Sequence, residues 1–167
     1  MKIFATLLCA WMVLGVSAYA NTENGGAMHN QSNIVAVFAH PDDETWINGT
    51  VALIASKTPL FHVVYVTSGD AGSDVSGQGL EGQALARERE REVQKALIAL
   101  GVQEPPIFLQ LPDSKLHQSD NRVRMQSKLD EVFQEYQPEV VLTFGEDGIT
   151  GHTDHRLVGM AARKAAD

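Results

Sequence analysis

The chain is poor in cysteine and in basic residues. Its 167 residues include one cysteine, Cys9, so a framework of intramolecular disulfides is excluded. Lysine and arginine together number 13 against 21 aspartates and glutamates, which gives a net charge of −8. So acidic a chain is a poor candidate for binding nucleic acid or an anionic membrane surface, because phosphate groups would be repelled. The sequence also contains no internal repeat.

An apolar stretch, residues 3–16, lies at the N-terminus. Lys2 precedes it and Ala-Tyr-Ala at 18–20 closes it, which is typical of a secretory signal peptide cleaved after Ala20. The alternative is an uncleaved anchor helix, for which the run is short. We therefore expect a secreted or periplasmic protein with a signal peptide at residues 1–20, a flexible polar leader at 21–32 and one domain at 33–167.

The rest of the chain alternates between apolar runs and helical patterns. Continuous apolar residues predict strands that are covered on both faces. Strands are expected at 34–39, 61–66, 107–109 and 139–144, and helices at 44–56, 83–100, 120–136 and from 154 onward. This order predicts an α/β, Rossmann-like domain with a mainly parallel sheet and helices on both faces. Because the last helix runs to Asp167 with no strand after it, we expect part of the domain to be missing at the C-terminus.

Two clusters of histidine and aspartate follow predicted strands. The sequence AHPDDE at 39–44 follows the first strand, and GHTDH at 151–155 follows the last. The carboxyl ends of parallel strands lie along one edge of a sheet, so we expect the clusters to meet there. Taken singly, the first cluster can be an acidic helix start and the second a helix cap. Together they favour a metal ion with a bound water, the arrangement of metal-assisted hydrolysis.

The spacing within the clusters suggests which side chains bind the ion and which one faces the water on it. His40 and Asp43 are three residues apart and can point at one ion, whereas Asp42 between them can point at the water on that ion. A third ligand from the pair His152 and His155 would complete a set of two nitrogens and one oxygen. Such a set suits zinc with a coordination position left open.

These segments resemble the LmbE-like (PIG-L) family of zinc-dependent N-deacetylases. AHPDDE is the most specific of the shared motifs, and residues 152–155 match the His-x-Asp-His motif of the family. Residues 67–72, TSGDAG, resemble its Thr-x-Gly-x-x-Gly loop, and Arg89-x-x-Glu92 followed by Leu-Gly-Val at 100–102 resembles a further stretch. The resemblance covers roughly residues 33–163. It implies removal of an acetyl group from the amide nitrogen of an N-acetylglucosamine-type substrate.

Carried over by position, the resemblance implies that His40, Asp43 and His155 bind Zn²⁺. Asp42 would be the general base that accepts a proton from the attacking water.

The same resemblance implies roles for residues around these. His152 would stabilise the oxyanion or protonate the leaving amine, and Asp154 would orient His152. Arg89 would lie near the site and steady the general base, although Arg87 and Arg91 are alternatives in the same helix.

Other residues carry weaker expectations. Trp46 is expected in the core, and His62 is expected to be a packed residue of the sheet. Asp113 is either a turn residue or part of the pocket lining. The glycine-rich loop at 69–82 is our candidate for a segment that gates substrate access.

Two other functions remain open at the level of sequence. One is a metal-dependent amidase for a different amide, such as a sugar-thiol conjugate. The other is a non-catalytic carbohydrate-binding module stabilised by metal, which the retention of Asp42 and His152 disfavours because neither is needed to hold zinc. In each case the expected partner is a small-molecule or glycan ligand, without nucleic acid and without stable membrane insertion after signal cleavage.

Overall fold

This computed structural model describes residues 32–167, so the predicted signal peptide and all but the last residue of the predicted leader lie outside the described residues. The elements run in the order β1 (Ile34–Phe38), η1 (Asp43–Ile47), α1 (Asn48–Ala55), β2 (Phe61–Thr67), α2 (Gly82–Ala99), β3 (Ile107–Leu111), α3 (Ser119–Tyr136), β4 (Val140–Leu142), α4 (Gly148–Gly151) and α5 (Thr153–Ala166). The element η1 is a 3₁₀ helix.

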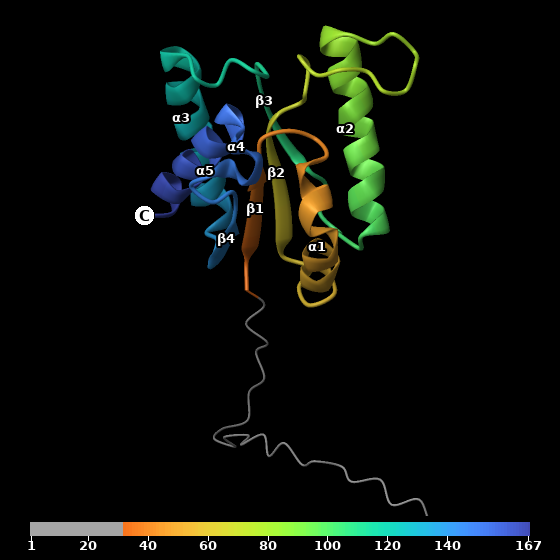
Figure 1. Cartoon of the computed structure of the whole chain (residues 1–167). Coiled ribbons are helices and arrows are strands. Elements are labelled where there is room, and N and C mark those ends of the chain that lie inside the picture. Colours follow the sequence, from red (N-terminus) through yellow and green to blue (C-terminus); the bar gives the residue numbers. More distant parts are fainter. Residues whose placement is uncertain (1–31) are drawn as a thin grey trace, which may run out of the picture.

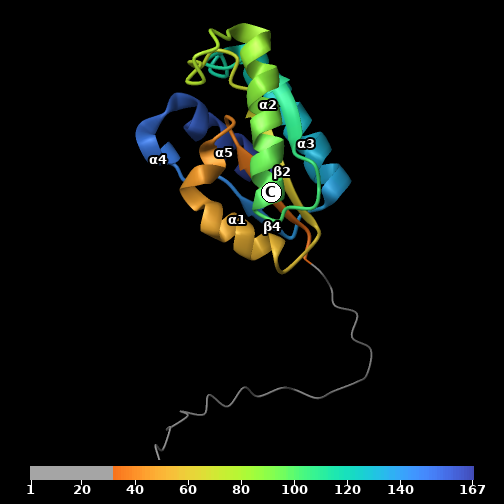
Figure 2. The same cartoon turned by 90° about the vertical axis from the view of Figure 1, so that its right-hand side faces the viewer.

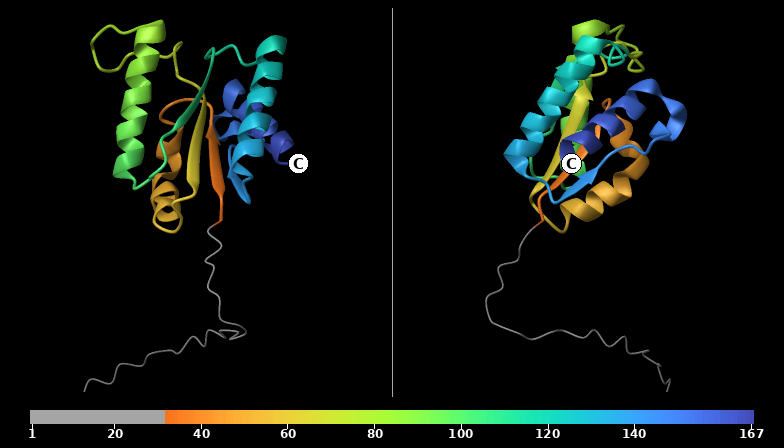
Figure 3. Two further views of the ribbon diagram at one scale, coloured as in Figure 1. Left: turned by 180° about the vertical axis from the view of Figure 1, so that it is seen from behind. Right: turned by 90° about the vertical axis from the view of Figure 1, so that its left-hand side faces the viewer.

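The four strands form one parallel sheet in the order β3-β2-β1-β4. Helices α1 and α2 cover one face, and α3 and α5 cover the other (Figure 1). Figure 2 looks onto the face that α2 covers, and the right-hand view of Figure 3 looks onto the opposite side. The predicted α/β architecture with a parallel sheet between two helical layers is confirmed.

The two central strands are apolar along their length because both of their faces are covered. All seven residues of β2 are buried, as are four of the five in β1. Helices α2 and α3 each bury one stripe of apolar side chains against this sheet, among them Leu97 and Leu129. Continuous burial of this kind is what parallel strands between helical layers require.

The chain changes direction next to β1. It first steps from β1 to β2 to β3 with α1 and α2 on one face, and then returns through α3 on the other face to add β4 beside β1. A crevice at the carboxyl ends of the strands is expected at such a reversal. The segment after β1 and the segment after β4 therefore lie next to each other.

The predicted helix at 44–56 is not continuous, which corrects the expectation for Trp46. Residues 43–47 form η1, and α1 begins only at Asn48. A 3₁₀ helix has three residues per turn instead of 3.6, so apolar residues that would share one face of an α-helix diverge. As a result Trp46 is 64% exposed and Leu53 is 59% exposed, and neither belongs to the core.

Smaller differences occur at the edge of the sheet. Strand β4, Val140–Leu142, lies within the predicted stretch 139–144, and among residues 32–167 it pairs with β1 alone. The segment between β4 and α5 contains the short helix α4. No helix within residues 32–167 combines the length and the apolar character needed to cross a bilayer.

Candidate metal centre

The segment after β1 is folded into a tight turn by its own aspartates. The Asp43 Oδ2 atom accepts the backbone N–H groups of Ala39 and His40, at 3.1 and 2.7 Å. Asp42 between them has φ 90°, in the left-handed region that residues other than glycine rarely adopt. Buried Glu44 holds this conformation by accepting the Asp42 N–H at 3.1 Å, and it also accepts the Tyr65 hydroxyl at 2.9 Å. Asp43 is thereby fixed as a buried carboxylate with its second oxygen free.

That second oxygen faces His155 at the start of α5. Asp43 Oδ1 lies 3.1 Å from His155 Nε2, while His155 Nδ1 lies 3.0 Å from the Gly148 carbonyl oxygen. A carbonyl only accepts, so this contact assigns the ring proton to Nδ1 and leaves a lone pair on Nε2. Nε2 and the Asp43 oxygen are therefore stabilised at this distance either by a proton on Nε2, which forms an ion pair, or by a metal ion that both atoms bind. The Phe144 ring stacks on His155 at 4.3 Å and keeps the imidazole in place.

His40 is surrounded by three carboxylates. Its Nε2 atom is 3.2 Å from Asp113 Oδ1 and 3.4 Å from Asp154 Oδ2, and its Nδ1 atom is 3.5 Å from Asp43 Oδ2. Burial alone would lower the pKa of His40, but these three carboxylates raise its pKa to about 11. The position therefore favours positive charge strongly, whether that charge is a proton or a metal ion.

Two groups of side chains place ligand atoms close enough together to share one ion. The first group is His40, His152 and His155, and the second is His40, Asp113 and Asp154, with the ligand atoms of each within 4.8 Å of one another. The imidazole nitrogens and carboxylate oxygens of this region suit zinc. All the expected ligands, His40, Asp43 and His155, line one open pocket of about 410 Å³.

Asp42 and Arg89 form the side of the pocket. The Arg89 Nη2 atom donates to Asp42 Oδ2 and to the Pro41 carbonyl oxygen, both at 2.8 Å. Partial burial raises the pKa of the Asp42 carboxyl, and the Arg89 charge opposes that rise. Of the three arginines considered in α2, Arg89 is therefore the one that reaches the site, whereas Arg91 pairs with Glu88.

Glycines make room for the arginine. An added Cβ on Gly69 would lie 2.3 Å from Arg89 Nη1, and one on Gly72 would lie 2.8 Å from it. Gly69 also has φ 71°, which accounts for glycine at this turn. The glycine-rich segment after β2 thus lets its backbone approach the guanidinium closely.

Asp154 contacts His152 through its backbone N–H and not through its side chain. The Asp154 carboxylate accepts the Ser114 N–H at 3.0 Å beside His40. The reason is local: His152 Nδ1 caps α5 by accepting the Asp154 N–H at 3.2 Å, so the Asp154 side chain turns inward and is 2% exposed. His152 itself remains exposed at the mouth of the pocket.

Asp113 is the site residue that sequence reasoning could not place. It follows β3 and is 6% exposed, and its carboxylate accepts the Ala71 N–H at 3.3 Å while facing His40. Burial would raise the pKa of Asp113, but His40 beside it holds the pKa below its usual value. Its position immediately beyond a strand end was the available signal, because the two histidine clusters occupy equivalent positions.

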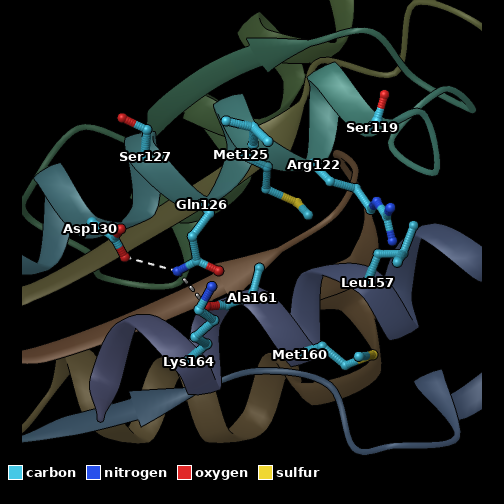
Figure 4. A pocket seen from close by; sticks show the side chains of 11 residues that line it. Ser119, Arg122, Met125, Gln126, Ser127, Asp130, Leu157, Met160, Ala161 and Lys164 are labelled. Carbon is cyan, nitrogen blue, oxygen red and sulfur yellow. Dashed lines mark hydrogen bonds between the residues drawn. The ribbon is translucent and has the colours of Figure 1, made fainter.

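A larger cavity of about 640 Å³ lies between α3 and α5, on the outer side of those helices (Figure 4). Its lining contains one carboxylate, Asp130, which accepts from Gln126 at 2.8 Å, and no histidine. Arg122, Lys164 and several apolar side chains form the remainder. It therefore lacks the chemistry found at the strand ends.

Comparison with known proteins agrees with this geometry. Residues 35–166 match the profile of the PIG-L family, described as GlcNAc-PI de-N-acetylase. A 1D-myo-inositol 2-acetamido-2-deoxy-alpha-D-glucopyranoside deacetylase of Corynebacterium diphtheriae is 31% identical, over 72% of this chain and 47% of the relative. The enzyme of the same description from Mycobacterium bovis is 32% identical, over 77% of this chain and 48% of the relative. The chain thus spans about half the length of the curated relatives that it matches.

Solved structures share the fold. An N,N'-diacetylchitobiose deacetylase of Pyrococcus horikoshii superposes with a TM-score of 0.69 at 25% identity, covering 82% of this chain and 50% of the other. A 4-carboxy-2-hydroxymuconate hydratase of Pseudomonas putida superposes with a TM-score of 0.66 at 24% identity, covering 79% and 54%, so the same fold also carries a different reaction. The family match and the strand-end histidines and aspartates together confirm the resemblance noted in the sequence: the chain belongs to the PIG-L family of deacetylases.

Proposed function

We propose that this chain is the zinc-binding part of an N-deacetylase that acts on the acetamido group of an N-acetylglucosamine-type substrate. The observation that carries the proposal is the contact between His155 Nε2 and Asp43 Oδ1 at 3.1 Å, which brings an imidazole nitrogen and a carboxylate oxygen together beside His40 while His155 Nδ1 is held by the Gly148 carbonyl oxygen. The family match and the deacetylase relatives support the reaction class. The choice of zinc rests on the ligand types.

His40, Asp43 and His155 would hold the ion, with Asp43 beside His155 at 3.1 Å. His152 offers a ligand atom within reach of those of His40 and His155, and Asp113 lies 3.2 Å from His40. When bound, zinc supplies a Lewis acid that polarises an amide carbonyl and acidifies water. The residues around it then divide the proton transfers of the hydrolysis. Water adds to the amide carbon, the C–N bond breaks, and acetate and an amine leave.

Asp42 would accept the proton of the attacking water. Its carboxylate is held by Arg89 at 2.8 Å, and its raised pKa suits a group that must take up a proton and release it again. His152 lies on the other side of the pocket mouth, with its ring 5.0 Å from that of His40. Its outward nitrogen, Nε2, is free to donate to the developing oxyanion or to the departing nitrogen, because Nδ1 caps α5.

The first test measures metal and turnover together. Zinc-loaded protein is expected to release free amine from N-acetylglucosamine glycosides, and Asp42→Asn is expected to retain zinc while its rate falls about 10²- to 10⁴-fold. His155→Ala is expected to lose zinc. Equal zinc content in His155→Ala and the parent would remove His155 from the site, and near-normal turnover in Asp42→Asn would exclude Asp42 as the base.

The substrate family follows from the relatives' names. The curated relatives are named for an inositol 2-acetamido-2-deoxyglucopyranoside, and the Pyrococcus horikoshii enzyme for diacetylchitobiose. We expect an uncharged compound of this type, because the acidic chain would repel polyanions. A zinc-loaded enzyme could be inactive on all such sugars and yet hydrolyse a sugar-thiol amide. That result would contradict the proposed substrate class but would agree with the proposed hydrolase activity.

We propose further that the protein is exported. The support is the basic start, the apolar run at 3–16 and the Ala-Tyr-Ala end. Mass spectrometry of protein recovered from an exporting host is expected to find Asn21 as the first residue. Recovery of a product that begins at Met1 would indicate an anchor or no signal.

A further inference from the structure

An indole ring stands at the edge of the metal centre without a partner among residues 32–167. Trp46 is 64% exposed, and it lines the same pocket as His40, Asp43 and His152. Tryptophan side chains of folded proteins are on average highly buried, so one left open beside a reactive site is unusual. Nothing in the mechanism above uses it.

The 3₁₀ geometry of η1 explains why the ring is at the pocket. With three residues per turn, side chains three positions apart lie one above the other. Trp46 is three residues after Asp43, so it stands about 6 Å further along the helix axis on the side of that ligand. The pocket therefore has buried carboxylates and imidazoles at its floor and a flat apolar surface at its rim.

Such a surface matches one face of a pyranose or cyclitol ring. The face of an indole carries partial negative charge, and the C–H bonds on one face of a sugar ring present partial positive charge to it. The indole has few rotatable bonds, so little freedom is lost on contact. The nearby carboxylates of Asp42 and Asp113 favour a neutral ring over an anionic one.

We propose that Trp46 is a stacking platform for a second, neutral ring joined to the N-acetylglucosamine unit. This inference rests on the proposed function, since the acetamido group must reach His40, Asp43 and His155 at the floor of the pocket. With the first ring placed there, the rim at Trp46 meets the ring attached to it. Trp46 then sets a preference for disaccharides and glycosides over the free monosaccharide.

The chain offers a direct optical test. It contains two tryptophans, Trp11 and Trp46, so Trp11→Phe leaves Trp46 as the sole indole. In the zinc-loaded chain with Asp42→Asn added to stop turnover, N,N'-diacetylchitobiose is expected to shift the emission to shorter wavelength and to protect it from acrylamide. N-Acetylglucosamine at the same occupancy, measured by calorimetry, is expected to change the emission much less.

Kinetics with Trp46 variants give an independent reading. Trp46→Ala is expected to raise KM for diacetylchitobiose roughly 3- to 10-fold, with kcat and the KM for N-acetylglucosamine little changed. Trp46→Phe is expected to restore most of the affinity. Leu53→Ala, which removes another exposed apolar side chain in the following helix, is the matched control and is expected to change neither parameter.

Two failures are distinguishable. If amine is released but Trp46 emission does not change, or if KM changes equally for both sugars, then Trp46 is not a stacking platform. Either result agrees with the proposed deacetylase activity. An emission change on binding with no amine release by the parent enzyme overturns the proposed reaction and leaves the platform standing. Absence of any binding of diacetylchitobiose overturns both.

Discussion

At the residue scale, the position of Arg89 requires that residues 69 and 72 be glycines, which have no side chain. Its guanidinium holds Asp42 at 2.8 Å while lying against the backbone of Gly69 and Gly72. Gly72 is not restricted to a positive φ, so alanine is tolerated there by the backbone. An alanine Cβ, however, would lie 2.8 Å from Arg89 Nη1 and 3.2 Å from the Gly69 carbonyl oxygen. The arginine must move if that methyl group is present.

Gly72→Ala is therefore expected to lower kcat roughly tenfold, because a charge-assisted hydrogen bond to the base is weakened. Zinc content is expected to stay at the parent level, since Arg89 contacts none of the expected ligands. Gly49→Ala, where an added Cβ meets no atom within 4 Å, serves as the control. An unchanged kcat in Gly72→Ala would show that the Arg89 contact does not assist Asp42.

The sequence predicted which residues gather at this site but not every contact between them. His40, Asp43 and His155 were predictable because each directly follows a strand or opens a helix on the same edge of the sheet. The contact between Asp154 and His152 runs through the Asp154 backbone N–H, while the direction of the Asp154 carboxylate depends on how α5 is capped. Trp46 was wrongly placed in the core, because periodicity alone does not distinguish a 3₁₀ turn from an α-helical one.

At the scale of elements, α5 is packed tightly against the segment that follows β4. A Cβ on Gly159 would lie 2.6 Å from the Phe144 carbonyl oxygen, which is backbone and cannot swing away. Gly159→Ala is therefore expected to lower the free energy of unfolding by about 1–3 kcal/mol, even though alanine favours the helix itself. Urea denaturation followed by circular dichroism measures this.

The same measurement on Gly49→Ala gives the comparison, since that helix position is open and alanine is expected to be neutral or slightly stabilising there. If Gly159→Ala were as stable as Gly49→Ala, the close packing of α5 on Phe144 would not hold in solution.

Strand β2 and helix α3 meet at a histidine whose charge is disfavoured. His62 is 7% exposed, and its ring lies 4.1 Å from that of Tyr136. Burial lowers the pKa of His62, and the charges of Glu104 and Glu135 only partly oppose this. The unfolded chain therefore binds a proton at this residue more readily than the native chain.

Stability is thus expected to fall as the pH falls through the unfolded pKa of His62, about 6.5, toward its lower native value. Above that window the residue is neutral in both states and contributes no penalty. Denaturation midpoints at pH 7.5 and 5.5 are expected to differ less in His62→Leu than in the parent. An equal difference in both proteins would mean that folding does not lower the pKa of His62.

The order of elements was largely predictable, while their ends were not. All four strands appear where continuous apolar runs predicted them, and Gly101 follows the end of α2 as expected of a helix stop. Strand β4 occupies only the part of the stretch 139–144 that pairs with β1 in the described chain, namely Val140–Leu142. The helix α4 was missed because four residues that include two glycines carry no helical pattern.

At the scale of the whole molecule, the candidate metal centre lies between the two ends of the described chain. Its expected ligands come from the segment after β1 and from α5. Helix α5 also packs against β1. Zinc at about 1,000 times its dissociation constant is expected to add about 4 kcal/mol to the free energy of unfolding, because it binds only the folded site. For a domain of this size that corresponds to a rise in Tm of roughly 10 °C.

Thermal denaturation with excess zinc and with a chelator measures this shift. His155→Ala is expected to melt at the same temperature in both conditions. An identical Tm for the parent with and without zinc would rule out a metal site that bridges these segments.

The reversal of strand order beside β1 also has a consequence for biosynthesis. His40 leaves the ribosome 114 positions ahead of Asp154, which corresponds to roughly 6–23 s at ordinary rates of translation. Throughout that interval β1, β2 and β3 can associate, but the last strand and helix that complete the coordination sphere do not yet exist. An ion that arrived early would meet two of its three expected ligands, His40 and Asp43, without His155. If the site binds a metal, discrimination among metal ions would therefore be made by the finished fold, after synthesis has passed α5, and would depend on which ions are available at that time.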